Sequence, residues 1–210
     1  MEEMELRKQI IATGIKLVHS GLTHGTCGNI SCKTDKDEIL ITPSSMLYEK
    51  IKPNDILKVD FDGNVKGRKN PSVETPLHLS IYKKRDDVGA IIHTHSTYAL
   101  AVSAVAESIP IFLDEIFSHI GGELSIANYA LPGSKELAEN VVKALGNKNA
   151  VLLSNHGAVC CGKNLEIAFE AAEAVEKICK IFILSSALGK IKILPKEGKE
   201  YQIKMFEMRK

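Results

Sequence analysis

The sequence predicts one α/β domain, in which a mainly antiparallel central sheet has helices on both sides. Three observations predict this fold class. Short apolar runs typical of buried strands alternate with longer segments of helical periodicity. Turn signals separate several of the strand segments, and no repeat, low-complexity stretch or linker divides the 210 residues. A chain of this length fits a single domain with a substantial core. We therefore expect one domain over residues 1–210, with a tail from about residue 190.

The first third of the chain is predicted to contain one helix followed by strand hairpins. Apolar side chains recur at a mostly helical spacing over residues 3–20, and Gly21 supplies a stop. Segment 25–33, rich in Gly and Ser, precedes a predicted hairpin that includes residues 38–42. The dipeptide at 62–63, Asp-Gly, is typical of the turn of a further hairpin.

The middle of the chain alternates helix, strand and helix. The Thr-Pro pair at 75–76 suits the N-cap and first position of a helix over 76–84. The apolar run over 88–95, "VGAIIHTH", is suited to a buried strand. A helix over about 97–106 is predicted to follow, ending before Pro110.

The last third continues the pattern to a long helix. Ser134 is a candidate N-cap for the next helix. "AVLLSNHG" (150–157) is predicted as a second buried strand that ends at its histidine, and "AVCCG" (158–162) as its continuation. Residues 164–188, rich in Ala with Glu and Lys on the outer face, predict the longest helix.

Composition excludes several classes of function. The formal net charge of +1 gives no long-range field for nucleic acid or an anionic membrane, so we expect neither as a partner. No apolar run approaches 18 residues, and the N-terminal segment lacks the apolar core of a signal peptide, which predicts a cytoplasmic protein. An odd number of cysteines without CxxC spacing argues against a disulfide framework or a cysteine metal cluster and favours reduced core residues: Cys27, Cys32, Cys160, Cys161 and Cys179.

Three histidines form a candidate metal site. Alternate side chains of a strand share one face, so His93 and His95 offer two imidazoles about 6.6 Å apart at the backbone, which is close enough for both to reach one ion. His156 ends another predicted strand, and Gly157 after it allows a sharp turn beside the imidazole. A His-x-His pair alone is equally typical of packed histidines. The third histidine favours a metal, with one coordination position open for catalysis.

Glu74 is the candidate acid/base. It lies at a predicted helix start, within "PSVETP". The alternative is a carboxylate stabilised by the dipole of the helix N-terminus.

Three short segments are candidates for binding an anion. Segment 25–31, "GTCGNIS", combines two glycines with Thr26, Asn29 and Ser31, and such a turn can form a nest for phosphate. Residues 42–45 and 71–72 likewise have hydroxyl side chains in a turn-forming sequence. Each segment alone is more typical of an ordinary turn. None matches a P-loop or GxGxxG, so a nucleotide is not indicated.

Five motifs resemble one known family. "GTCGNIS", "ITPSS", "PSVETPLH", "IIHTHS" and "LLSNHG" stand in the order and spacing of the zinc-dependent class II aldolase/adducin family, and the resemblance covers about residues 5–188. The chain is most similar to the branch that cleaves L-fuculose 1-phosphate. The resemblance implies a nine-stranded, mostly antiparallel sheet, assembled as a homotetramer with active sites between adjacent subunits.

The resemblance also implies a site and a reaction. His93, His95 and His156 match the zinc ligands, and Glu74 matches a residue that ligates the resting metal and then acts as base. The implied reaction cleaves a ketose 1-phosphate to dihydroxyacetone phosphate and an aldehyde, with zinc polarising the carbonyl while Glu74 moves a proton. The phosphate-binding positions are Thr26, Asn29, Ser44, Ser45 and Ser72.

Three departures from the fuculose branch bear on these expectations. Val73 stands where that branch has a second serine after Ser72. Asp114 and Glu115 stand in place of a tyrosine supplied by the neighbouring subunit, and we expect a catalytic part for Glu115. Tyr201 is the candidate for the tail tyrosine that closes the site.

Other functions remain alternatives. The same family contains a sugar-phosphate dehydratase branch, which uses a carboxylate near position 115, a 4-epimerase branch, which has Asp at the position of Glu74, and a decarboxylase branch. Adducin head domains share the fold as non-catalytic interaction modules. The remaining histidines have no partner at ligand spacing and are expected at the surface or in the core: His19, His24, His78 and His119.

Overall fold

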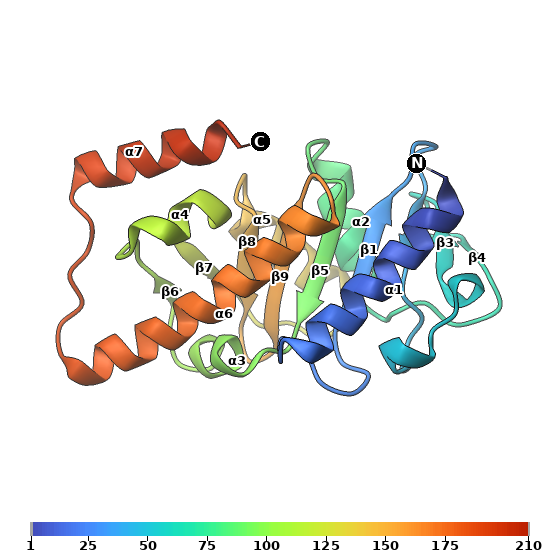
Figure 1. Ribbon diagram of the computed structural model, residues 1–210, viewed down its shortest axis with the longest axis horizontal. Helices are drawn as coiled ribbons and strands as arrows, with labels where there is room; N and C mark the ends of the chain where they lie inside the picture. The colour runs from blue at the N-terminus through green and yellow to red at the C-terminus, as the bar shows by residue number, and fades with distance from the viewer. Residues whose placement is uncertain (1, 210) are drawn as a thin grey trace.

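A single mixed sheet organises the molecule. The computed structural model describes residues 2–209, except for the side chains of residues 115–117. Within this part of the chain, nine strands form one sheet in the order β4-β3-β2-β1-β5-β9-β8-β7-β6 (Figure 1). Every neighbouring pair is antiparallel except β7 and β8, which are parallel. The predicted α/β fold with a mainly antiparallel sheet is confirmed, as is the number of strands that the resemblance implied.

The elements have the following bounds. The strands are β1 (Asn29–Lys33), β2 (Ile39–Ile41), β3 (Leu57–Val59), β4 (Val65–Lys66), β5 (Ala90–Thr94), β6 (Ser108–Ile109), β7 (Leu124–Ala127), β8 (Ala150–Leu153) and β9 (Gly157–Gly162). The helices are α1 (Glu3–His19), α2 (Thr75–Lys84), α3 (Thr97–Ser103), α4 (Asp114–Ile120), α5 (Lys135–Leu145), α6 (Leu165–Leu188) and α7 (Lys196–Glu207), with short 3-10 turns at Tyr48–Lys50 and Pro53–Asp55.

Both faces of the sheet are buried, which explains the continuous apolar runs of its central strands. On β5, Ile92 packs into the cluster beneath α1, α3 and α6, whereas Ile91 packs into the cluster beneath α2 and α5. On β9, Cys160 packs into the first of these clusters and Cys161 into the second. In Figure 1, α1, α3 and α6 cover the near face. The central strands are therefore held by apolar contacts on two sides.

Local signals account for some of the helix boundaries. The side chain of Ser134 accepts a hydrogen bond of 3.1 Å from the backbone N–H of Leu137, which confirms the predicted N-cap of α5. Helix α2 begins at Thr75, one residue before the predicted start. The strand predicted to end at His156 ends at Leu153, because residues 154–156 form the turn that reverses the chain into β9.

Two helices, α4 and α7, are absent from the sequence prediction. Helix α4 is only seven residues long, and the only residues of α7 that are buried are Gln202 and Phe206, so neither has a long apolar stripe. Gln202 donates a hydrogen bond of 3.1 Å from Nε2 to Oδ1 of Asp114. Phe206 packs against Gly121, where a Cβ atom would overlap the ring. These contacts hold α7 against α4, at the upper left of Figure 1.

No helix in the described range is long and apolar enough to pass through a membrane. The cysteines are free, and four of the five are buried as predicted. Cys27 is exposed, contrary to the expectation of a core residue, because it lies in the loop between Gly25 and Gly28, both of which have left-handed backbone conformations.

Candidate metal centre

The structure brings three imidazoles together at one end of the central strands. His93 lies on β5, His95 follows β5 directly, and His156 lies in the turn before β9, which pairs with β5. The ring centroids are 4.7 to 5.1 Å apart. The three candidate ligand atoms all lie within 4.8 Å of one another. This arrangement is consistent with a divalent metal site.

The turn that carries His156 depends on two unusual backbone conformations. Asn155 has a φ of 59°, a left-handed conformation that Asn tolerates better than most residues. Gly157 has a φ of 146°, and a Cβ atom there would overlap the carbonyl oxygen of Thr94 and lie 3.2 Å from Cδ2 of His95. The glycine thus allows the turn to approach β5 closely and leaves room for the second imidazole.

The orientation of His93 is fixed by the sheet. Its Nδ1 lies 2.9 Å from the carbonyl oxygen of Ala158, which can only accept a hydrogen bond, so Nδ1 carries the proton. Nε2 therefore has a lone pair, and it lies 2.8 Å from Nε2 of His95. A metal-binding histidine commonly donates through its other ring nitrogen in this way.

Glu74 closes the fourth side of the group. It is the N-cap residue of α2, and its side chain is 5% exposed. Oε2 accepts a hydrogen bond of 2.8 Å from Nδ2 of Asn29 and lies 3.1 Å from Nε2 of His93. Oε1 lies 3.4 Å from Nε2 of His156. The carboxylate therefore faces the same point as the three imidazoles.

The donor set fits a divalent cation. Oε1 of Glu74 and Oδ1 of Asn29 are buried acceptors without a hydrogen-bond partner among the described residues. Buried acceptors left unpaired are costly. A cation would satisfy these atoms together. Imidazole nitrogens with a carboxylate oxygen are ligands that zinc prefers.

The electrostatics keep the ligands in their metal-binding forms. Burial, with the neighbouring His93 and His156, lowers the pKa of His95 to about 4. Burial, with His93, also lowers the pKa of His156. Burial raises the pKa of Glu74, but the electrostatic interactions with His93 and His156 and the hydrogen bond from Asn29 outweigh this effect, so that its net pKa is lowered. At neutral pH these imidazoles are neutral and the carboxylate is ionised.

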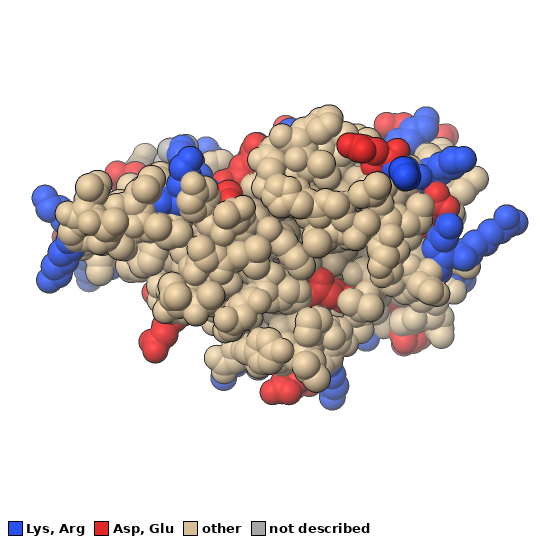
Figure 2. All heavy atoms as spheres, turned by 90° about the horizontal axis from the view of Figure 1, so that it is seen from below, with Lys and Arg blue, Asp and Glu red and all other residues tan. Residues whose placement is uncertain are grey.

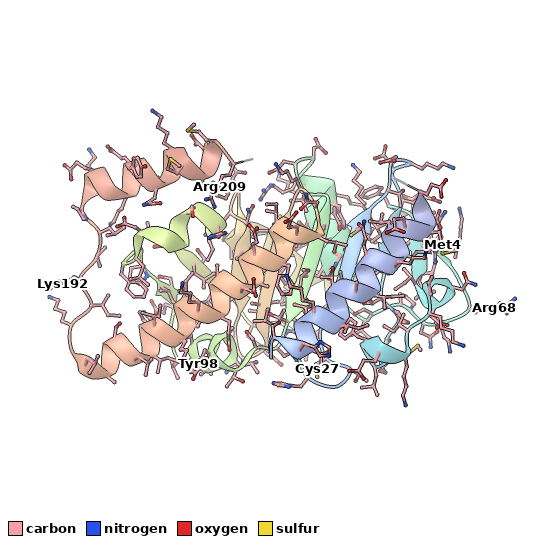
Figure 3. All side chains as sticks on the ribbon, in the orientation of Figure 1. Met4, Cys27, Arg68, Tyr98, Lys192 and Arg209 are labelled. Carbon is pink, nitrogen blue, oxygen red and sulfur yellow. The ribbon has the colours of Figure 1, made fainter. Side chains whose placement is uncertain are left out.

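A cavity of about 180 Å³ opens beside the metal ligands. It lies at the edge of the molecule that carries Cys27, at the bottom of Figure 3. A β-bridge between Pro43 and Pro71 brings the two serine segments together at its wall. The cavity is lined by Glu74, His95 and His156 together with all of the candidate substrate-binding residues: Thr26, Asn29, Ser44, Ser45 and Ser72.

The serine segments present polar atoms at the cavity wall. Ser45 has a left-handed backbone with a φ of 57°, and its hydroxyl lies 3.3 Å from that of Ser44. The hydroxyl of Ser72 accepts a hydrogen bond of 3.3 Å from the backbone N–H of Glu74. The serine loop at 71–72 is thus connected directly to the candidate acid/base.

None of the described side chains at the cavity wall is a lysine or an arginine. Figure 2 shows the molecule from the side of the cavity, where Lys and Arg gather mainly toward the two ends of the face. Hydroxyls, amides and backbone N–H groups, together with a bound cation, would have to compensate the charge of an anionic substrate.

Several candidate residues lie elsewhere. Ser31 is fully buried and bonds to side chains of α2, so its predicted place in the anion-binding turn is wrong. Ser31 lies on the same side of β1 as Asn29 but two residues further along the strand, where α2 covers it. Tyr201 and Asp114 do not line the cavity; Tyr201 is 60% exposed on α7. The side chain of Glu115 lies outside the described residues.

Some residues of the cavity wall were not predicted from the sequence. Pro132 lines the cavity from the loop before α5, and no local pattern marked it. Cys27 and Gly28 lie between two predicted substrate-binding residues, so their position in the motif could have indicated that they line the cavity. A Cβ atom at Gly28 would lie 2.5 Å from the carbonyl oxygen of His93, so only glycine permits this approach.

The comparisons agree with this geometry. The profile described as "Class II Aldolase and Adducin N-terminal domain" matches residues 8–183. The chain is 36% identical over 203 residues to 5-deoxy-D-ribulose 1-phosphate aldolase of Bacillus thuringiensis serovar kurstaki, covering 96% of this chain and 95% of that protein. It is 37% identical over 188 residues to L-fuculose phosphate aldolase of Escherichia coli K12, covering 90% and 87%. A solved structure of an L-fuculose 1-phosphate aldolase superposes with a TM-score of 0.93 at 39% identity, covering 97% and 96%.

Proposed function

Because the chain belongs to the class II aldolase and adducin family and is a metal-dependent aldolase of sugar phosphates, we propose that it cleaves a ketose 1-phosphate of the L-fuculose 1-phosphate type. The products are dihydroxyacetone phosphate and an aldehyde. The observation that supports this most directly is the shared cavity, in which the candidate metal ligands and the hydroxyl-bearing segments meet.

His93, His95 and His156 hold the metal, which we propose is zinc, and Glu74 ligates it when no substrate is present. When bound, the ion would supply Lewis acidity at the substrate carbonyl. The carbonyl oxygen of Ala158 accepts a hydrogen bond from Nδ1 of His93 and thereby fixes the tautomer of His93.

Glu74 moves the proton at the carbon beside the ketone. It is the only carboxylate among the described residues that line the cavity. Its lowered pKa keeps it ionised and able to accept a proton, and the amide of Asn29 holds Oε2 in place. The arrangement thus combines a base and an electrophile on one side of a small cavity.

Hydroxyls and amides orient the phosphate of the substrate. The relevant groups face the cavity from three separate loops, and together they have the chemistry of an anion-binding nest. We assign the phosphate to Thr26, Asn29, Ser44, Ser45 and Ser72.

Two substrates are the principal candidates, because relatives named for L-fuculose phosphate and for 5-deoxy-D-ribulose 1-phosphate have nearly equal identity to this chain. The test is incubation of the zinc-loaded protein with each ketose 1-phosphate and identification of the products. Dihydroxyacetone phosphate with lactaldehyde or with acetaldehyde supports the proposal and selects the substrate. Loss of water, loss of carbon dioxide or inversion of the sugar would instead identify dehydratase, decarboxylase or 4-epimerase activity. An inert protein without metal would favour an adducin-like interaction module.

We also propose that the protein is a homotetramer with active sites between subunits. Three apolar side chains near the cavity loops are strongly exposed: Val73 is 65%, Tyr129 58% and Leu131 68% exposed. Exposed apolar groups of this kind are typical of an interaction surface. Tyr201 and Glu115 are then catalytic residues that a neighbouring subunit supplies, which accounts for the position of Tyr201 outside the cavity of its own chain.

Mixed oligomers test this assembly. Glu74→Gln and Tyr201→Phe variants are co-expressed with different tags, and the hybrids are purified. If Tyr201 acts on a neighbouring site, hybrids regain activity that both parent proteins lack, because some sites then contain both intact residues. A monomer in light scattering would overturn the tetramer, and tetrameric hybrids without activity would overturn the assignment of Tyr201 to a neighbouring site.

A further inference from the structure

A polar seam connects β1 to α2 beneath the candidate active site. Asn29 and Ser31, two residues apart, point to the same side of β1, whereas Glu74, His78 and Tyr82 are spaced by four along α2 and share one helix face. Nδ2 of Asn29 donates to Glu74 over 2.8 Å. The hydroxyl of Ser31 lies 2.6 Å from Nδ1 of His78 and 2.9 Å from the hydroxyl of Tyr82.

The lower part of this seam is completely removed from solvent. Ser31 and His78 are 0% exposed and Tyr82 is 2% exposed. Burying polar groups is costly, and apolar side chains would pack a helix against a sheet equally well. Packing alone therefore does not explain a serine, a histidine and a tyrosine at these positions.

The hydrogen bonds of the seam have one favourable direction. The hydroxyl of Tyr82 contacts no hydrogen-bonding side chain other than Ser31 in the described part of the chain, so its proton must point to Ser31 if it is not to remain unpaired. Ser31 then donates its own proton to Nδ1 of His78. The proton of His78 is consequently on Nε2, which is buried and has no partner among the described residues.

We propose that this Tyr82–Ser31–His78 relay fixes the Nε2–H tautomer of His78 and makes His78 a positioning residue for Glu74. The backbone N–H of His78 donates to the carbonyl oxygen of Glu74 over 3.3 Å, so the two residues share one helical turn. Nε2 of His78 and Oε1 of Glu74 are both buried and without a hydrogen-bond partner among the described residues. The relay thus places the dipole of a buried N–H group one helical turn from a buried carboxylate, and in this role the dipole helps to keep the carboxylate between the amide of Asn29 and the imidazoles. This role rests on the proposed function of Glu74.

The first experiment determines the tautomer without substrate. The zinc-loaded protein is labelled with ¹⁵N-histidine, and the ring nitrogens of His78 are assigned by comparison with the His78→Gln protein. We expect a protonated Nε2 and an unprotonated Nδ1. A protonated Nδ1 would reverse the direction of the relay and overturn the inference.

The second experiment separates positioning from packing. Glutamine places its amide nitrogen near the position of Nε2, whereas asparagine places its amide near that of Nδ1 and keeps a partner for Ser31. We expect His78→Gln to retain most of the proton exchange into dihydroxyacetone phosphate, and His78→Asn to lose about tenfold or more in rate, with little change in KM. Thermal unfolding and metal content check that both variants fold.

Equal rates in the two folded variants, or a better rate for His78→Asn, would overturn the positioning role. If either variant fails to fold, Ser31→Ala replaces it, and a rate equal to the wild type would have the same consequence. A wild-type protein that exchanges no proton defeats the proposed function of Glu74 and the positioning role with it. The tautomer of His78 is measured without substrate, so the test of the relay does not depend on the proposed function of Glu74.

Discussion

Nδ1 of His93 donates a hydrogen bond to the carbonyl oxygen of Ala158, 2.9 Å away on the neighbouring strand. The acceptor belongs to the backbone of a fully buried strand, so its position does not depend on a side chain that could rotate. The lone pair of Nε2 is therefore fixed by the sheet itself. One strand pairing thus sets both the position and the protonation state of the first candidate metal ligand.

His95→Ala is expected to abolish metal retention and turnover. The substitution removes one of three imidazoles, and the remaining two do not define a stable zinc site. The measurement is the metal content per chain after dialysis, together with the rate of ketose 1-phosphate cleavage. His19→Ala, an exposed position at the end of α1, is the control and should behave as the wild type. Full activity of His95→Ala would defeat the assignment of the site.

Glu74→Gln is expected to keep the metal and stop proton exchange. Glutamine preserves the shape and an oxygen atom near the imidazoles, but it cannot accept the proton from the substrate. The measurement is the incorporation of deuterium from solvent into dihydroxyacetone phosphate. Unchanged incorporation would rule out the role of Glu74 as base, whereas loss of metal would show that its charge is needed for binding.

Ser44→Ala is expected to raise KM for the phosphorylated substrate about tenfold or more while metal content and stability stay the same. One hydrogen bond to a charged group contributes about 1.5 to 3 kcal/mol, and the half-exposed serine loop can lose it without leaving a buried group unpaired. The measurement is steady-state kinetics. A change in kcat with KM unchanged would contradict the assignment of Ser44 to the phosphate.

Gly157→Ala is expected to destabilise the protein and weaken metal binding. The added Cβ atom would overlap the carbonyl oxygen of Thr94, and the φ of 146° is unfavourable for alanine, which together cost about 1 to 3 kcal/mol or more. Gly21→Ala is the control, since Gly21 also has a positive φ, of 72°, but has open space around it. Denaturant unfolding and zinc titration measure the two effects. Equal losses in both variants would show that the close approach to β5 is unimportant.

The stability of the metal-depleted protein is expected to fall as the pH decreases from about 6.5 to about 3. Burial lowers the pKa of His78 from 6.5 to about 3, so within this window the unfolded chain binds a proton that the folded chain does not. Unfolding is therefore favoured as the pH falls, by up to about 1.4 kcal/mol per pH unit for this residue. Above pH 6.5 the contribution of His78 is constant. The measurement is denaturant unfolding at several pH values, and His78→Gln should show a shallower slope. An unchanged slope would contradict the buried neutral imidazole.

The sequence predicts the central elements well because their signals are local. Continuous apolar runs predict β5 and β8, and the His-x-His spacing predicts two imidazoles on one face. The meeting of His156 with these two depends on the pairing of β5 with β9, which follows from no local pattern. The resemblance of the five motifs to a known family predicts this meeting, because it implies the fold of the whole family.

The parts that could not be predicted depend on tertiary contacts. Helix α7 has few apolar residues, and it is held by Gln202 and Phe206 against elements far away in the sequence. Ser31 belongs to a motif that suggests phosphate binding, yet it lies far enough along β1 to be covered by α2, whose His78 its hydroxyl contacts. The strand predicted to continue to His156 ends earlier because a left-handed Asn155 reverses the chain.

The candidate metal ligands and the candidate phosphate-binding serines at 44–45 have different structural support. The imidazoles are anchored on or next to strands buried on both faces, whereas Ser44 is half-buried and Ser45 is exposed in a loop at the cavity wall. Mutations at these two serines can therefore accumulate without disturbing the strands that carry the imidazoles. The affinity for the phosphorylated end of a substrate can thus be tuned during evolution while the carbon–carbon bond chemistry is inherited unchanged.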